Sequence, residues 1–330
     1  MSLAAACRNE VYSMKKTDKT APKKHNKREN RELTLMAVPA AVWYVLFCYL
    51  PLFGIAFAFK QFTPVPGESL FTNLFVNSPW VGLKNFSFLI RSSQMPQIMF
   101  NTLFYNLIFL AAGIVLPVLL AVFLTEIHNK RFSGVVQTVM ILPYFLSWVI
   151  VGYCLYGFLA TDEGQVNHVL HLLGREAVQW YQSPQYWRVI LILIEIWKSV
   201  GYSMMIYLSA ITAIDRSLYE SATMDGAGFW RKTVSITLPQ LRPTISTIFI
   251  LRMGSILASD FGLFYQVPLD SNSLQPVTQT LDVYVYKALM TQANFSYSSA
   301  AAFLQSLVGC VLLIAANLII RRLDPDSGLG

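Results

Sequence analysis

The sequence predicts an all-α integral membrane protein with six transmembrane helices. Hydrophobic residues make up 55% of the 330-residue chain and charged residues only 13%, and the mean hydropathy is +0.47. These values lie outside the range of ordinary soluble domains. Six apolar segments are each long enough to cross about 30 Å of hydrocarbon. Lipid is therefore the expected solvent for most of the chain.

The six predicted spans are separated by more polar stretches. They cover residues 35–59, 98–125, 134–160, 189–214, 244–267 and 300–320. Four prolines lie within or near the ends of these spans: Pro39, Pro51, Pro117 and Pro143. Because neighbouring helices can absorb the hydrogen bonds that a proline removes, we expect these positions to be kinked.

Residues 1–34 differ from the rest of the chain and are predicted to be a mostly disordered cytoplasmic tail. They contain nine of the 25 Lys and Arg residues and almost no bulky apolar residues. A signal for membrane topology is the favoured interpretation, and a lipid-binding polybasic segment or a nucleic-acid arm are the alternatives. The predicted division is thus a basic tail, 1–34, followed by a transmembrane domain, 35–330.

The distribution of basic residues predicts the orientation. With the N-terminus inside, the cytoplasmic pieces contain seventeen Lys and Arg residues and the outer pieces six, while Lys198 and Arg252 fall within spans. Cytoplasmic loops of membrane proteins carry the excess of Lys and Arg. Both termini, and the polar stretch between the fourth and fifth spans, are therefore expected to face the cytoplasm.

That polar stretch, residues 215–243, is predicted to form two short helices and is called the elbow below. Ser217 and Glu220 have the spacing of a capping box, which would begin the first helix. Asp225-Gly226 would end it, because glycine adopts the left-handed conformation at little cost. A second helix is expected over 227–238.

The second elbow helix is predicted to stop at Pro239 and Pro243, which lack the amide that a helix needs to continue. Trp230, Val234 and Leu238 recur every four residues and would face the rest of the protein. Phe229 would then point away and could contact a partner. The alternative is that Phe229 packs between the two elbow helices.

The elbow also resembles a known motif. Glu220-Ser221-Ala222, Asp225-Gly226-Ala227 and Ile236-x-Leu238-Pro239 resemble the EAA loop of permease subunits of bacterial ABC importers. Ser221 stands where the motif usually has alanine, and Asp215-Arg216 where sugar permeases often have a proline. The resemblance implies a type I ABC importer fold in which the elbow docks as a coupling helix on an ATP-hydrolysing subunit. The implied docking residues are Glu220, Ser221, Ala222, Asp225, Gly226, Ala227 and Phe229.

A wider resemblance covers roughly residues 80–322. Gly82-Leu83-Lys84-Asn85-Phe86 and, further on, Asn101-Thr102-Leu103 are similar to the start of the helical core of maltose-type sugar permeases. The LplB-like group, associated with oligosaccharides or polysaccharides including alginate, is the most similar. The resemblance implies a bacterial inner-membrane protein that imports a carbohydrate. Its implied partners are an ATPase dimer, which would bind ATP and Mg, a second permease subunit and a solute-binding protein.

Several ionisable and polar side chains fall inside the fourth and fifth spans. They are Glu195, Lys198, Tyr202, Arg252, Ser255 and Asp260. A lone charge near the bilayer centre costs about 3 kcal/mol on insertion scales, so such groups face protein or water. One hypothesis is that they border a polar passage between two permease subunits. The alternative is that Glu195 and Lys198, one helical turn apart, neutralise each other.

Sequence motifs for catalysis are absent. The chain has no G-x-x-x-x-G-K-[ST] phosphate loop, no H-E-x-x-H and no G-x-S-x-G, and its four cysteines have no metal-ligand spacing. We therefore expect a transport subunit without an ATPase site or a cofactor of its own. The alternatives are a permease for amino acids or peptides, an intramembrane enzyme, or a secondary transporter.

Overall fold

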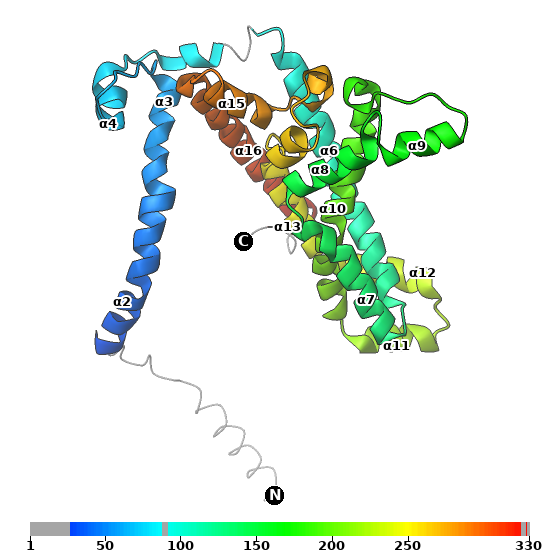
Figure 1. Cartoon of the computed structure of the whole chain (residues 1–330). Coiled ribbons are helices and arrows are strands. Elements are labelled where there is room, and N and C mark those ends of the chain that lie inside the picture. The colour runs from blue at the N-terminus through cyan, green and yellow to red at the C-terminus, as the bar shows by residue number, and fades with distance from the viewer. Residues whose placement is uncertain (1–26, 88–91, 325–327, 329–330) are drawn as a thin grey trace, which may run out of the picture. The chain divides into compact units, whose positions relative to one another are not determined.

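The computed structural model describes residues 27–87, 92–324 and 328. The regular secondary structure of this part of the chain is helical, and one isolated β-bridge joins Lys60 to Trp80 (Figure 1). The all-α prediction is confirmed. The chain divides into two compact units, Met1–Gly54 and Ile55–Gly330.

The described part of the first unit is one nearly continuous helical stretch. The helix α2 spans Lys27–Tyr44 and is followed by a π-helical turn, η1 (Val45–Tyr49), and a 3-10 stretch, η2 (Leu50–Ile55), which contains Pro51. The helix begins within the predicted basic tail, 1–34, so residues 27–34 of a stretch expected to be mostly disordered are helical. Residues 1–26 lie outside the described part of the chain.

The second unit begins with short helices around the end of the first apolar segment. These are α3 (Ala56–Phe59), α4 (Leu70–Thr72), η3 (Asn73–Asn77) and η4 (Gly82–Phe86). The long helix α16 (Phe295–Leu323) packs against α3 and η4, and the ring of Phe303 meets those of Phe59 and Phe86. Helical segments far apart in sequence therefore meet here.

Two long helices, α6 (Met95–Thr125) and α10 (Pro184–Thr212), form the most extensive pair of the second unit. One buried cluster along this pair contains Tyr105, Trp187 and Phe264. A second cluster, nearer the elbow, contains Tyr207 and Leu241. Both clusters consist of large apolar side chains, whose removal from water is the main stabilising contribution to packing.

The third predicted span, 134–160, is not one straight helix. Its parts are α7 (Lys130–Ile141), η5 (Leu142–Phe145) and α8 (Trp148–Leu159), and the chain bends by 98° between η5 and α8. Pro143 lies in η5, and Ser147 restarts the helix by accepting a hydrogen bond from the amide of Ile150. The expected kink at Pro143 is thus a sharp break. Two short helices, α9 (Gln165–Leu172) and η6 (Trp180–Gln182), then lead into α10.

The elbow and the fifth predicted span are also divided differently from the prediction. The elbow helices α11 (Arg216–Met224) and α12 (Phe229–Lys232) are followed by a π-helical turn, η7 (Thr233–Thr237), and α13 (Leu238–Gly254). Pro239 and Pro243 were predicted to end the second elbow helix, but the chain stays helical through both. Pro239 stands in the first turn of α13, where no amide donor is required, and η7 shifts the hydrogen-bond register just before it.

The helix α13 ends at Gly254, so the predicted span 244–267 is interrupted. The chain turns before a π-helical segment, η8 (Gly262–Gln266), and continues through η9 (Asn272–Leu274), α14 (Gln275–Thr278) and α15 (Leu281–Met290) to α16.

Four helical stretches in the described residues are long and apolar enough to cross a membrane, and the bent pair 130–159 would make a fifth. These four are Thr34–Phe59, Met95–Thr125, Pro184–Thr212 and Phe295–Leu323.

Candidate functional site

The first elbow helix begins at Asp215, not at the predicted capping box. The Asp215 carboxylate accepts a hydrogen bond from the Ser217 amide at 2.9 Å, which makes Asp215 the N-cap of α11. Ser217 therefore lies inside the first turn, and Glu220 is too far along to complete a capping box. The amide and hydroxyl of Ser217 hold the pKa of the Asp215 carboxyl below its usual value.

The same helix ends in a Schellman motif. The Gly226 amide donates to the carbonyl of Thr223 at 3.0 Å, and the Ala227 amide donates to that of Ala222 at 2.9 Å. Gly226 has a φ of 76°, in the left-handed region that favours glycine. The prediction that Asp225-Gly226 ends the first helix is confirmed. Three residues of the EAA-like motif thus have a structural role in closing α11.

The second elbow helix presents a different face from the predicted one. Trp230 and Val234, predicted to pack inward, are 61% and 60% exposed, whereas Thr233 and Thr237 are buried. Phe229 lies on the inward face, with its ring centroid 6.0 Å from that of Phe123. The prediction was wrong for Trp230, Val234 and Phe229 because it followed apolar residues alone, whereas Leu238 packs against the buried cluster as predicted. The threonines can be buried because their hydroxyls are hydrogen-bonded, to the carbonyl of Phe229 and to the hydroxyl of Tyr219.

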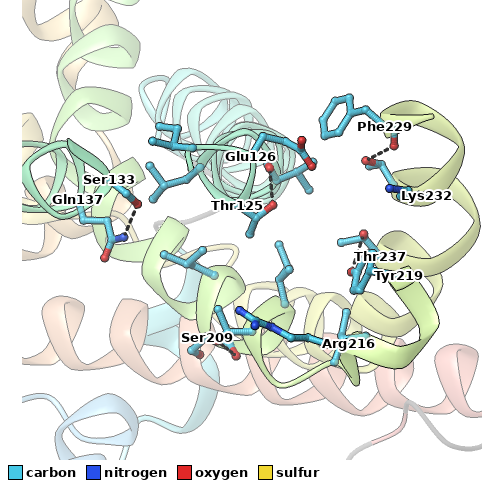
Figure 2. Close-up of a pocket in the computed structure, with 18 of the residues that line it drawn as sticks. Thr125, Glu126, Ser133, Gln137, Ser209, Arg216, Tyr219, Phe229, Lys232 and Thr237 are labelled. Carbon is cyan, nitrogen blue, oxygen red and sulfur yellow. Dashed lines mark hydrogen bonds between the residues drawn. The ribbon is translucent and has the colours of Figure 1, made fainter. Parts of the chain in front are cut away.

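A cavity of about 790 Å³ separates the elbow from the ends of α6, α7 and α10 (Figure 2). Its lining combines apolar side chains with four charged ones: Glu126, Arg216, Glu220 and Lys232. Glu220 and Phe229 line this cavity, whereas Ser221, Asp225 and Gly226 do not and are exposed to solvent. Ala222 and Ala227 are half-buried. The predicted docking residues therefore divide between the outer surface of the elbow and its cavity side.

A second, smaller cavity lies between α6, α10 and α13. Its volume is about 120 Å³, and four of the predicted passage residues line it together: Glu195, Arg252, Ser255 and Asp260. Asn106 also lines it and donates to the carbonyl of Ile256 at 2.8 Å. The interruption of α13 at Gly254 places Asp260 beside the same cavity. Asn106 was not predicted as a site residue, because an uncharged side chain in an apolar helix gave no signal of its partners on other helices.

Lys198 and Tyr202 belong to a neighbouring cluster at the break between η5 and α8. The Lys198 ammonium donates to the Tyr144 carbonyl at 2.8 Å and lies 5.0 Å from the ring centroid of Trp148. The rings of Tyr144 and Tyr202 are stacked, 4.4 Å apart. The break leaves the carbonyl of Tyr144 free to accept the buried ammonium.

No ion pair joins Glu195 to Lys198 within the described residues, so their mutual neutralisation is not how this arrangement satisfies Lys198. The indole nitrogen of Trp148 donates to the Asp260 carboxylate at 2.8 Å, which connects the cluster around Lys198 to the second cavity. Tyr144 and Trp148 were not predicted as site residues. The kink expected at Pro143 was the only sequence signal near them.

Comparison with known proteins identifies the family. A family model described as "Binding-protein-dependent transport system inner membrane component" matches residues 113–326, which include the elbow. The chain belongs to this family. The resemblance inferred from the elbow motif is therefore confirmed.

Two curated relatives from Bacillus subtilis (strain 168) match this family member over most of their length. The polygalacturonan/rhamnogalacturonan transport system permease protein YteP is 35% identical over 299 residues, covering 91% of this chain and 90% of YteP. Protein LplB is 33% identical over 301 residues, covering 91% and 92%.

Solved structures with the same fold are also known. A bacterial ABC transporter involved in the import of the acidic polysaccharide alginate matches with a TM-score of 0.80 and 31% identity, covering 90% of this chain and 97% of that one. The alginate transporter in complex with an alginate pentasaccharide-bound periplasmic protein matches with a TM-score of 0.80 and 30% identity, covering 92% and 98%. The fold described above is thus that of an ABC transporter permease.

Proposed function

We propose that this family member is a membrane-spanning subunit of an ATP-driven importer that moves a carbohydrate from the periplasm to the cytoplasm. YteP is named for polygalacturonan and rhamnogalacturonan, and the matching structures transport alginate. These relatives support an oligosaccharide or polysaccharide substrate, and an acidic one in particular. The cations Lys198 and Arg252 within the apolar region are compatible with an acidic solute.

The structure of the elbow is the main observation that supports the proposal. It is a compact pair of helices, closed by the Schellman motif at Gly226, that presents Ser221, Asp225 and Gly226 to solvent. These groups would dock on an ATP-binding subunit, together with Glu220, Ala222, Ala227 and Phe229. ATP and Mg would be held by a dimer of that partner, because the sequence of this chain has no phosphate loop.

The topology consistent with this docking has six crossings. Four are the candidate spans, the fifth is the bent pair 130–159, and the sixth is α13 together with the segment after Gly254. In this topology both termini and the elbow would face the cytoplasm, which the excess of basic residues in the tail, the elbow and the C-terminal end supports.

In this proposal the solute passes two sets of polar side chains beside α10. One set lines the second cavity, and the other is the cluster around Lys198. Arg252, Ser255 and Asp260 are exposed in the single chain, although they lie next to apolar helices. Because charged groups avoid lipid, a second permease subunit would cover them and complete a polar passage. Tyr202, Lys198 and Glu195 would border the same passage from α10.

Transport would follow from movement of the elbow. Closure of the ATPase dimer on ATP would draw the docked elbows together, and α10 and α13, which flank the elbow, would carry the motion into the membrane. The two permeases would alternate between inward-open and outward-open arrangements around the polar passage, and hydrolysis would reset them.

The proposal is tested by purifying the chain with its partners and reconstituting the complex. We expect an ATP-binding subunit, a second permease and a solute-binding protein to assemble with it. ATPase activity should be stimulated by oligosaccharides in a panel of neutral and acidic sugars. A stable chain that transports without ATP would contradict the proposal.

The passage is tested separately with Lys198→Ala and Arg252→Ala. Each substitution should lower transport in an assembled complex that retains basal ATPase activity. Normal transport in both variants would exclude these residues from the passage.

A further inference from the structure

The segment between the first candidate span and α6 exposes several large apolar side chains and buries several polar ones. In residues 60–87, called the connecting segment here, the side chains of Asn73, Ser78 and Asn85 are buried to 4% exposure or less. Five large apolar side chains of the same segment are 62% to 77% exposed: Leu70, Phe71, Val76, Trp80 and Leu83. A segment that folds against water buries its apolar groups, so this arrangement indicates an apolar environment.

The buried polar side chains bind backbone groups of their own segment and of α3, which precedes it. Asn73 accepts from the Val65 amide at 3.0 Å, and the Ser78 hydroxyl donates to the Asn73 carbonyl at 2.7 Å. Asn85 donates to the carbonyls of Ala58 and Lys60 at 3.0 and 2.9 Å. Polar side chains here satisfy backbone groups that water would otherwise satisfy, as a lipid environment requires.

Two of the three charged groups of the segment, those of Lys60 and Glu68, are also hydrogen-bonded to it. The Lys60 ammonium donates to the carbonyls of Leu74 and Phe75, at 2.9 and 3.1 Å, within the η3 turn. The carboxylate of Glu68 accepts a hydrogen bond from the Asn77 amide group. Neither group projects freely from the exposed apolar face.

Contacts with two candidate spans hold the connecting segment at the ends of these helices. Its start follows directly on Phe59, the last residue of the span Thr34–Phe59, and the ring of Trp80 stacks on that of Phe59 at 5.7 Å. The Ser296 hydroxyl, in the first turn of α16, donates to the Lys60 carbonyl and accepts from the Phe62 amide, both at 2.9 Å. The segment is thus attached where one span ends and another begins (Figure 1).

We propose that the exposed apolar face of the connecting segment is embedded in the interfacial region of the lipid bilayer. Trp and Lys residues, such as Trp80 and Lys84, are typical of that region, in which an amphipathic segment lies parallel to the membrane with its apolar face toward the acyl chains. Only the choice of leaflet rests on the proposed function, which places this face on the periplasmic side.

The segment would anchor the outer ends of the first span and of α16 laterally in the lipid. Phe59 and Ser296 connect these helices to it, so a force on either helix would be resisted by the embedded side chains.

The test uses the assembled complex in lipid nanodiscs, with the native cysteines replaced. A fluorescent thiol label at Val76→Cys, on the proposed lipid face, is compared with one at Asp162→Cys, in the exposed turn before α9. The Val76 label should lose most of its emission with brominated phospholipids and little with aqueous iodide. The Asp162 label should show the opposite result.

Two outcomes would overturn the inference. One is iodide quenching at Val76 equal to that at Asp162, with no effect of brominated lipid. The other is a Val76 label that is open to iodide until solute-binding protein is added, which would make this face a protein-docking surface. An impermeant thiol reagent applied to intact cells tests the side of the membrane at Asp162. Labelling from outside tests the proposed topology, and quenching tests the lipid contact. Failure of one proposal can therefore be distinguished from failure of the other.

Discussion

The hydroxyl groups of Tyr219, in α11, and Thr237, at the end of η7, lie 2.9 Å apart and share a hydrogen bond. Both residues line the cavity beside the elbow. Their bond connects the first elbow helix to the residue just before α13. The first elbow helix is thus connected to the helical stretch that leads into α13 at a second point, besides the chain itself. A partner that pulls on α11 would move α13 through this contact.

Tyr219→Phe is expected to weaken that connection without removing the ring. A net loss of about 1 kcal/mol is typical for one intramolecular hydrogen bond. We expect more ATP to be hydrolysed per solute transported, measured in proteoliposomes. Tyr153→Phe, at an exposed position on α8, is the matched control and should leave the ratio unchanged. Equal ratios in wild type and Tyr219→Phe would show that the bond does not transmit movement.

Gly226 and Gly228 offer a matched test of the Schellman motif. At both positions the space that a Cβ would occupy has no neighbouring atom within 4 Å, but Gly226 has a φ of 76° and Gly228 a φ of −71°. Gly226→Ala should therefore cost about 1 kcal/mol of elbow stability from backbone strain alone, and Gly228→Ala should cost clearly less. Hydrogen exchange of α11 in the assembled complex measures both. Equal protection in the two variants would contradict the assigned strain.

Gly201 is predicted to be intolerant of any side chain for a different reason. A Cβ at this position in α10 would lie 1.8 Å from the carbonyl oxygen of Met140 in α7. Gly201→Ala should separate these helices and cost about 3 kcal/mol, the upper range for overpacking. Gly113→Ala, on α6 with no neighbouring atom within 4 Å, is the control. Thermal unfolding in detergent should show a large loss for the first variant only; similar unfolding temperatures would refute the close approach.

The N-cap at Asp215 is expected to make the stability of α11 depend on pH. Its pKa is lowered in the folded protein by the backbone and hydroxyl of Ser217. The carboxylate therefore stabilises α11 above its unfolded pKa of about 3.9, and this stabilisation is lost as the pH falls through the lower folded pKa. Asp215→Asn keeps a capping side chain that does not titrate. The rate of amide exchange in α11 of the wild type, divided by the rate in Asp215→Asn at the same pH, should change below about pH 4. A constant ratio would contradict the N-cap.

Much of the fold was predictable because it depends on composition and on local chemistry. Long apolar stretches predict helices in lipid, and Gly226 predicts a helix end because few residues adopt its backbone conformation. The convergence of Glu195, Arg252 and Asp260 on one cavity followed from the cost of placing charge in lipid.

The errors arose where the helical period itself changes. The inward face of the second elbow helix was predicted from apolar residues at a regular spacing, but η7 is π-helical and buries Thr233 and Thr237. At the 98° bend after η5, Tyr144 and Trp148 also form tertiary contacts with Lys198 and Asp260, from other helical segments. A periodicity argument on one segment contains no information about such partners.

The central claim, that the elbow docks on an ATP-hydrolysing subunit, is tested most directly by photo-crosslinking from Met224. This side chain is 88% exposed, one residue before the turn that closes α11. A photoreactive amino acid placed there, in cells that express the complete transporter, should form an adduct that mass spectrometry identifies as the ATP-binding subunit. The same group at Leu172, which is 75% exposed at the end of α9, should not. Adducts to the ATP-binding subunit from Leu172 and none from Met224 would contradict the claim.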